Sequence, residues 1–197
     1  MELQKCLINY FSQLRKVDYK WKELSKEARR PLYATKNQSQ QLQLIVSEDV
    51  RDGDLYKIDE LRERLIYKIL MGIDGELLVL LDILKPFNNI TQELKSRLKN
   101  LEDARSKVSL DDVAIKELVD GTPERPRLNL LLEWAIESFN FYHELYLQIN
   151  KGISQFDHKS EEMIESLIKS FAEDRFRRAR IDQIFAFTQF FIKDNIS

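Results

Sequence analysis

Histidine and cysteine, the side chains that most often bind metals, are scarce in this sequence. Its histidines are His143 and His158, and its single cysteine is Cys6. Neither histidine has a second one four positions away, the spacing that places two ligands on one face of a helix. Cys6 has no cysteine partner for a thiolate site. We therefore predict no metal site, and we expect both histidines at the surface or half-buried.

Other patterns that carry chemistry are also missing from the sequence. The five glycines are scattered and form neither the dinucleotide-binding nor the Walker pattern. Paired carboxylates such as Glu161 and Glu162 lie in segments that resemble polar helix faces, where they are ordinary solvated charges. Catalysis requires groups in perturbed environments, and none of these patterns provides one. We predict a protein that is not an enzyme and that binds no cofactor.

A cluster of arginines is the most strongly charged feature. It comprises Arg175, Arg177, Arg178 and Arg180, with Phe176 among them. Such a cluster can contact nucleic acid, dock on an acidic protein surface or form the solvated first turn of a helix, and the sequence leaves these three interpretations open. The formal net charge of −2 gives no long-range attraction for nucleic acid. We do not expect direct nucleic-acid binding, and we name the four arginines as candidate partner-binding residues.

Phenylalanines gather in the same region of the chain. Six of the eleven lie close together: Phe171, Phe176, Phe185, Phe187, Phe190 and Phe191. A helix that is apolar on several sides either lies at the centre of a bundle or forms an interface, and both alternatives remain open. Phe187, Phe190 and Phe191 therefore join the arginines as candidate partner-binding residues.

The composition indicates a soluble, intracellular, all-α protein. Charged residues make up 32% and hydrophobic residues 43%, and there are only 5 glycines and 4 prolines. The longest purely apolar run, residues 77–81, is far too short to span a membrane. A single cysteine does not suit a secreted protein, and polar residues interrupt the apolar positions near the N-terminus, so we expect no signal peptide.

Apolar residues recur at alternating intervals of three and four in two long segments. The first series is Leu3, Leu7, Tyr10, Leu14, Val17, Trp21, Leu24 and Ala28. The second series is Leu77, Leu80, Leu84, Phe87, Thr91, Leu94, Leu98 and Leu101. This spacing is typical of helices that pack along one long stripe, as in coiled coils. We expect the two stripes to pack on each other, antiparallel or obliquely.

Prolines and glycines set the expected ends in the first half of the chain. Pro31 is expected to end the first helix. A weaker helix is expected over residues 32–46, followed by a loop over residues 47–54. A third helical region is expected over residues 55–107.

Three further breakers lie inside this third region. Pro86 is expected to kink the helix without ending it, because the apolar series continues in phase. Gly72 and Gly75 each cost about 1 kcal/mol relative to alanine in a helix. They indicate either a break or the close approach of another helix.

The second half of the chain is expected to hold shorter helices. A pattern like a capping box at residues 109–112 predicts a short helix that stops at Gly121. We expect one elongated helical bundle, a single domain over residues 1–197, with an exposed hinge over residues 109–126. Further helices are predicted over residues 127–152, 159–173 and 175–193. In the first of these, Trp134 lies on the apolar face and is expected to be buried.

Three segments together resemble the AIRIM family of ribosome maturation factors. They are residues 61–101, where ELRERL is followed by IDGELLVLLDIL; residues 130–153, LLLEWAIESFNFYHELYLQINKGI; and the C-terminal DQIFAFTQFFIKDN. Their order and spacing agree with the family. The polar stretch after Pro31 and residues 109–125 agree less well.

The resemblance implies a non-catalytic adaptor, in the cytoplasm and the nucleus. Members of the family join a second small helical protein, the cyclin-dependent-kinase-interacting protein, and bind a type II AAA ATPase. The complex acts on precursors of the large ribosomal subunit, so contact with pre-ribosomal particles is indirect, and a chromatin role has also been attached to it. No membrane is involved. The alternative function is a generic coiled-coil scaffold subunit of another assembly, such as a tethering or chromatin complex.

Overall fold

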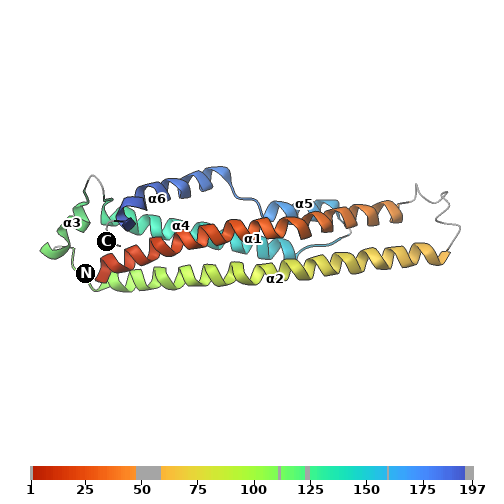
Figure 1. Ribbon diagram of the computed structural model, residues 1–197, viewed down its shortest axis with the longest axis horizontal. Coiled ribbons are helices and arrows are strands. Elements are labelled where there is room, and N and C mark those ends of the chain that lie inside the picture. The colour runs from red at the N-terminus through yellow and green to blue at the C-terminus, as the bar shows by residue number, and fades with distance from the viewer. Residues whose placement is uncertain (1, 48–58, 111, 123–124, 159, 194–197) are drawn as a thin grey trace. The chain divides into compact units, whose positions relative to one another are not determined.

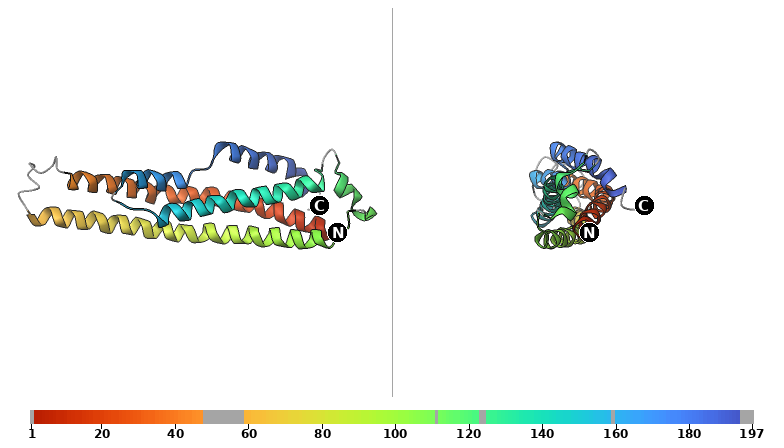
Figure 2. Two further views of the ribbon diagram at one scale, coloured as in Figure 1. Left: turned by 180° about the vertical axis from the view of Figure 1, so that it is seen from behind. Right: turned by 90° about the vertical axis from the view of Figure 1, so that its left-hand side faces the viewer.

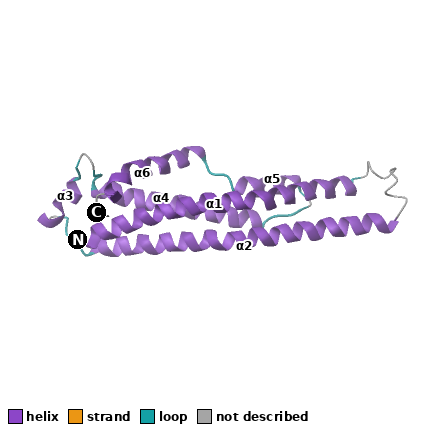
Figure 3. Ribbon diagram, in the orientation of Figure 1, coloured by secondary structure: helices purple, strands orange, loops and turns teal. Residues whose placement is uncertain are grey.

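The protein is all-α over the part of the chain that can be described. The computed structural model describes residues 2–47, 59–110, 112–122, 125–158 and 160–193. Its elements, drawn in Figure 1 and coloured by type in Figure 3, are α1 (Glu2–Val46), α2 (Asp59–Ser106), η3 (Val113–Ile115), α3 (Lys116–Asp120), α4 (Leu128–Ser154), α5 (Glu161–Ser170) and α6 (Arg175–Lys193). None of these described residues lies in a strand, and the predicted fold class of long helices in an all-α bundle is confirmed.

The helices form two compact units. Unit 1 comprises Met1–Lys22, Phe87–Tyr146 and Glu173–Ser197, and unit 2 comprises Glu23–Pro86 and Leu147–Ala172. The helices α1, α2 and α4 each contribute one part to each unit, and we describe the units separately. The single domain with an exposed hinge remains a prediction.

In unit 1, α1 and α2 are antiparallel and bury facing stripes. The first part of α1 lies beside the second half of α2, as a contact between them shows: Gln13 Nε2 donates a hydrogen bond to Glu93 Oε2 at 2.9 Å. Farther along α1, the rings of Trp21 and Phe87 lie 4.5 Å apart between centroids. Figure 2 shows the two helices side by side from behind. The expected packing of the two stripes is therefore confirmed in this unit.

The stripe residues of unit 1 are almost completely withdrawn from solvent. Those of α1 are at most 1% exposed: Leu3, Leu7, Tyr10, Leu14, Val17 and Trp21. Those of α2 are at most 8% exposed: Phe87, Thr91, Leu94, Leu98 and Leu101. Each large apolar side chain buried in this way contributes about 1.5–3 kcal/mol, so the two stripes contribute strongly to the stability of this unit.

In unit 2, α1 continues through Pro31, and the prediction that this proline ends the helix is wrong. The separate helix expected over residues 32–46 is the second part of α1. The buried face continues beyond Pro31 through two leucines and two small polar residues: Leu32, Thr35, Ser39 and Leu42. The hydroxyl of Thr35 donates a hydrogen bond to the carbonyl of Pro31 at 2.8 Å.

The reason for this continuity is energetic. A proline inside a helix costs about 3 kcal/mol, whereas burying two leucines and their neighbours contributes more than that. The end was predicted from Pro31 alone, and the helix after it looked weak because Thr35 and Ser39, both fully buried, belong to a polar run. Of the loop expected next, only Ser47 lies within the described residues; residues 48–54 lie outside them.

Helix α2 is also continuous, through Pro86, Gly72 and Gly75. At Gly72 a Cβ atom would lie 2.5 Å from Nε2 of Gln38 on α1, so the end of this side chain occupies the space beside the glycine. At Gly75 a Cβ atom would have nothing within 4 Å apart from the helix itself. The sequence left open a break or a closely packed helix at these glycines: the helix breaks at neither, and no other described helix lies close to Gly75.

The remaining elements follow the predicted order. The short helix α3 ends before Gly121, whose φ of 71° is a left-handed conformation that favours glycine. Beyond it, Thr122 and Arg125 exchange backbone hydrogen bonds of 2.8 and 3.1 Å. Pro123, part of the expected hinge, lies outside the described residues. Helices α4 and α5 agree with their predicted bounds to within a few residues, and α6 has the bounds that were predicted.

In unit 2, α4 and α5 come into close contact at Gly152. A Cβ atom there would lie 2.6 Å from Ser170 Cβ and closer still to Ser170 Oγ. Ser170 is itself 6% exposed and donates its hydroxyl to the carbonyl of Leu167 at 2.7 Å. No side chain larger than glycine fits at this position unless the two helices move apart.

None of the described helices combines the length and the apolar character that are needed to cross a membrane.

We expect Gly152→Ala to lower the free energy of unfolding by about 1–3 kcal/mol, the usual cost of overpacking. Gly75→Ala is the matched control, and because its Cβ meets open space it should raise stability by about 0.5–1 kcal/mol. Urea unfolding followed by circular dichroism measures both. Equal effects of the two substitutions would show that the contact between Gly152 and Ser170 does not constrain the helices.

Candidate partner-binding surface

Helix α6 carries all seven candidate residues named from the sequence, and its start is fixed by a capping residue. The carboxylate of Asp174 accepts a hydrogen bond from the backbone N–H of Arg177 at 2.9 Å, the usual N-terminal cap. From there the buried face of the helix includes Ile181, Ile184, Thr188 and Phe191. Their spacing of three and four leaves the intervening side chains on other faces of α6.

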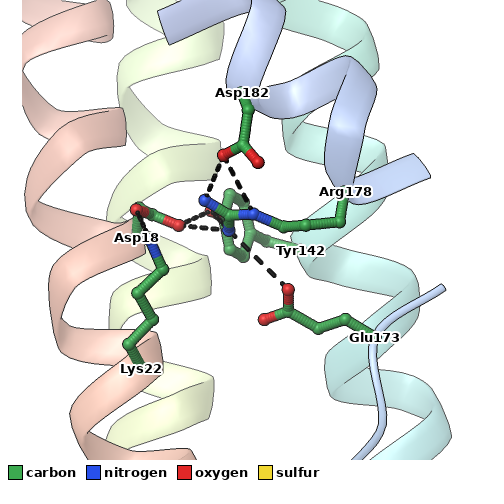
Figure 4. A network of polar contacts seen from close by, with 6 residues as sticks. All are labelled: Asp18, Lys22, Tyr142, Glu173, Arg178 and Asp182. Atoms are coloured by element: carbon green, nitrogen blue, oxygen red, sulfur yellow. Dashed lines mark hydrogen bonds and ion pairs between the residues drawn. The ribbon is translucent and has the colours of Figure 1, made fainter. Parts of the chain in front are cut away.

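Arg178 enters a network of polar side chains within unit 1 (Figure 4). It is paired with Asp18 of α1, and the two side chains are 15% and 12% exposed. Tyr142 of α4 donates its hydroxyl to the same carboxylate at 2.8 Å, and Lys22 donates to its other oxygen at 2.8 Å. One carboxylate thus links side chains from three helices.

Two more carboxylates complete the network around Arg178. Asp182 lies 2.6 Å from Arg178 Nη2, and Glu173 lies 3.7 Å from Arg178 Nη1. Asp182 is one turn farther along α6, whereas Glu173 precedes the helix. The guanidinium therefore faces three acidic groups, which compensates for its removal from water.

Burial and charge shift the pKa values of these groups. Burial alone would raise the pKa of Asp18, but hydrogen bonds from Arg178, Lys22 and Tyr142 bring it below its ordinary value. Burial lowers the pKa of Arg178, but the hydrogen bonds to Asp18 and Asp182 raise it more, so that the pKa lies above its ordinary value. Burial raises the pKa of Glu173, and Arg178 opposes that effect only in part.

The other arginines of the cluster have different surroundings. Arg177 pairs with Glu144 of α4 at 2.6 Å and lies over the ring of Phe141. Arg180 pairs with Glu137, also on α4, at 3.0 Å. Arg175 is exposed and makes no side-chain bond to the described residues. Three of the four arginines thus pair with acidic side chains of their own chain, an arrangement outside the three interpretations that the sequence left open.

The sequence held no signal for these pairs, because Glu137 and Glu144 are seven positions apart on α4 whereas Arg177 and Arg180 are three positions apart on α6. Arg15 of α1 is a further residue that sequence reasoning missed. It donates to the carbonyl of Phe185, and its guanidinium lies 5.3 Å from the centre of that ring.

The phenylalanines of α6 divide between core and surface. Phe191 is 0% exposed and belongs to the core of unit 1, whereas Phe187 and Phe190 are 57% and 59% exposed. Phe176 is 88% exposed at the start of the helix. The core interpretation therefore holds for Phe191, whereas Phe176, Phe187 and Phe190 are exposed and their role in an interface stays a prediction.

Phe187 and Phe190 line a groove between α4 and α6. Trp134 of α4 forms its floor and stacks on Phe187, with ring centroids 5.6 Å apart and planes inclined by 17°. Leu130, 37% exposed, borders it. We name Leu130, Trp134, Phe187 and Phe190 the aromatic surface.

Trp134 is 6% exposed, as the sequence predicted. Its indole Nε1 is buried and has no hydrogen-bond partner among the described residues. An indole N–H donates strongly and is usually paired when buried. Burying Trp134 with its unpaired donor therefore costs more free energy than burying an all-carbon side chain at this position.

Each histidine has a neighbour of its own among the described residues. His143 stacks on Phe139 with ring centroids 5.4 Å apart, and His158 lies 3.8 Å from Asp157. Within the described ranges, no three histidine, cysteine or acidic side chains come together as metal ligands.

These observations define an all-α bundle protein with an exposed aromatic groove between α4 and α6. The chain matches the CA109-like family, described as "Ribosome biogenesis protein C1orf109-like", over residues 1–190. It belongs to this family of ribosome biogenesis proteins, and the resemblance to the AIRIM family is confirmed. A search of curated proteins gave no match.

We expect Asp18→Ala and Arg178→Met each to lower the free energy of unfolding by about 3 kcal/mol, because either change leaves a charge withdrawn from water. The double variant should lose less than the sum, with a coupling energy of about 0.5–3 kcal/mol. Arg177→Ala is the control, and since Arg177 and Glu144 are 47% and 56% exposed it should cost less than about 1 kcal/mol. Urea unfolding at neutral pH measures all four proteins.

The coupling also has an expected pH dependence. Because the pKa of Asp18 is lowered on folding, its contribution is fully present above the ordinary carboxylate pKa and is lost as pH falls through the lowered value. If the stability lost by the double variant at neutral pH equals the sum of the losses of Asp18→Ala and Arg178→Met, the two side chains do not interact and the network is wrong.

We expect Trp134→Ala to lower the free energy of unfolding by about 3–5 kcal/mol, the usual cost of deleting a large buried aromatic side chain. Trp134→Phe should cost less, since it keeps a ring against Phe187 and removes the unpaired N–H. Thermal unfolding of both variants measures the difference. An alanine variant that melts with the wild type would show that Trp134 acts as a surface contact.

Proposed function

We propose that this protein is a non-catalytic adaptor subunit of an AAA ATPase complex that acts in cytoplasmic maturation of the large ribosomal subunit. Its membership in a ribosome biogenesis family supports the process. The resemblance in three segments supports the partners, a type II AAA ATPase and a second small helical protein, with indirect contact to pre-ribosomal particles and no membrane. On the same basis we propose that the protein occurs in both cytoplasm and nucleus.

The aromatic surface is the observation that carries the adaptor proposal. Phe187 and Phe190 each leave more than half of their side chain in water, although Phe191 of the same helix is fully buried. Covering an exposed phenylalanine contributes about 1.5–3 kcal/mol. Aromatic residues around a groove are also typical of the few positions that dominate the affinity of a protein interface.

The charged face of α6 contributes less to this proposal than the sequence suggested. Arg177 and Arg180 have partners on α4, and reversing them to glutamate would bring four carboxylates together. If the double glutamate variant lost a protein partner, the cause could be the repulsion between α6 and α4, so the result would not identify a partner-binding surface. Arg178 is paired with Asp18, so Arg175 is the arginine of the cluster whose charge lies fully in solvent. One exposed charge neutralises at most one phosphate, and this does not favour direct nucleic-acid binding.

The test is affinity purification of the tagged full-length protein, followed by mass spectrometry. We expect the wild type to recover an AAA ATPase, and the double variant Phe187→Ala with Phe190→Ala to recover at least about tenfold less, because two hot-spot side chains are removed. Phe176→Ala is the matched control, since Phe176 is more exposed but lies outside the aromatic surface. It should recover as much as the wild type.

Other outcomes of this purification contradict the proposal. Recovery of a tethering or chromatin complex without any AAA ATPase would favour the coiled-coil scaffold alternative. RNA-dependent recovery that falls steeply with salt would favour a nucleic-acid-binding protein. Unchanged recovery by the double phenylalanine variant would show that the ATPase contacts a different surface.

A further inference from the structure

A second exposed apolar stripe lies on α2, within unit 2. Tyr67, Met71 and Leu78 are 66%, 55% and 63% exposed. Gly75 lies between Met71 and Leu78 in the sequence. With it included, the positions 67, 71, 75 and 78 are separated by four, four and three residues. These four residues share one side of the helix, and we name them the α2 stripe. It lies apart from the buried cluster of Leu42, Ile69 and Ile73, which α2 covers with its other side.

Gly75 is the feature of the α2 stripe that the chain itself does not explain. A glycine inside a helix costs about 1 kcal/mol relative to alanine. Gly72, one turn earlier, is explained by Gln38, whose side chain occupies the space of the missing Cβ. Gly75 has open space there, and it lies between two exposed apolar side chains. A bare backbone at this place allows another backbone to approach closely, which is a main use of glycine.

Acidic residues lie on both sides of the bare position. Asp74 is exposed and Glu76 is half-buried, and neither makes a side-chain hydrogen bond or ion pair within the described part of the chain. A third acidic residue, Asp82, lies one turn beyond Leu78 and pairs with Lys85 at 2.7 Å. The side chains that flank Gly75 therefore present uncompensated negative charge.

This charge distinguishes between possible occupants. A second copy of the chain that crossed at Gly75 would bring Asp74 and Glu76 of both molecules together, and four carboxylates around one crossing repel each other. A helix with basic residues beside its apolar face would instead neutralise them. The span from Tyr67 to Leu78 is about 17 Å at 1.5 Å per residue, which matches three turns of such a helix.

We propose that the α2 stripe docks an amphipathic helix of another protein, with a small residue of that helix crossing at Gly75 and its lysines or arginines facing Asp74 and Glu76. This inference rests on the proposed function, because the second small helical protein of the complex is the partner expected to supply the helix. It assigns to that partner a surface on unit 2, whereas the aromatic surface belongs to unit 1.

The test uses purified full-length protein and the purified second helical protein of the proposed complex, with affinity measured by isothermal titration calorimetry. Gly75→Gln fills the bare position, and we expect it to weaken binding at least tenfold while the melting temperature of the free protein stays the same or rises. The double variant Asp74→Lys with Glu76→Lys should also weaken binding at least tenfold and reduce its dependence on salt.

Two matched controls accompany these variants. Asp103→Lys reverses an exposed charge on the same helix in unit 1, and Leu44→Gln removes an apolar side chain that is 65% exposed on α1 in unit 2. Both should bind like the wild type. A photo-reactive residue at position 78 should cross-link to a segment of the partner with basic residues beside its apolar face, and one at position 44 should not.

The outcomes separate this inference from the proposed function. If the wild type binds the helical partner and Gly75→Gln binds it equally well, the α2 stripe is not the docking site, and the adaptor function stands. If the wild type does not bind this partner, both the inference and the proposed assembly are wrong. If the wild type forms dimers in sedimentation equilibrium and Gly75→Gln is monomeric, a second copy covers the stripe and the inference is overturned.

Discussion

The apolar stripe of α1 has to be covered by other helices over its whole length, and most of the fold follows from that constraint. Its positions recur at intervals of three and four from Leu3 to Leu42, and all are buried. In unit 1, α2 covers it with a facing stripe; in unit 2, Leu42 at its far end packs in a cluster with Ile69 and Ile73 of α2. The same requirement keeps the helix intact at Pro31, where local preference alone would end it.

Polar contacts then position α6 on this apolar base. Asp18 lies at the edge of the α1 stripe, and it joins Tyr142 and Arg178 so that α1, α4 and α6 share one carboxylate. Ion pairs of this kind add modest stability, because desolvation offsets much of their attraction, but they admit few alternative arrangements. On the same helix, Phe191 is buried and Phe187 is 57% exposed, so α6 contributes both to the core and to the aromatic surface.

The sequence predicted the elements that depend on apolar periodicity and missed those that depend on pairing across the fold. The residues of the Leu3–Ala28 series are all buried, and Trp134 is buried, because repeated intervals report directly on one face of a helix. Thr35 and Ser39 made the second part of α1 look weak, since buried small polar residues look the same in sequence as exposed ones. The partners of Arg177, Arg178 and Arg180 could not be predicted, because distant charges are brought together only by the packing of helices.

The placement of the two tryptophans gives the molecule a built-in optical reporter. Trp21 is enclosed in the core of unit 1 between Phe87 and Tyr142, so its emission should be blue-shifted and constant as long as the protein is folded. Trp134 forms the floor of a groove that opens to solvent and stacks on a largely exposed ring. Any ligand that settles against Phe187 alters the surroundings of this second indole alone. Occupancy of the groove is therefore readable in the intrinsic fluorescence of the unlabelled protein.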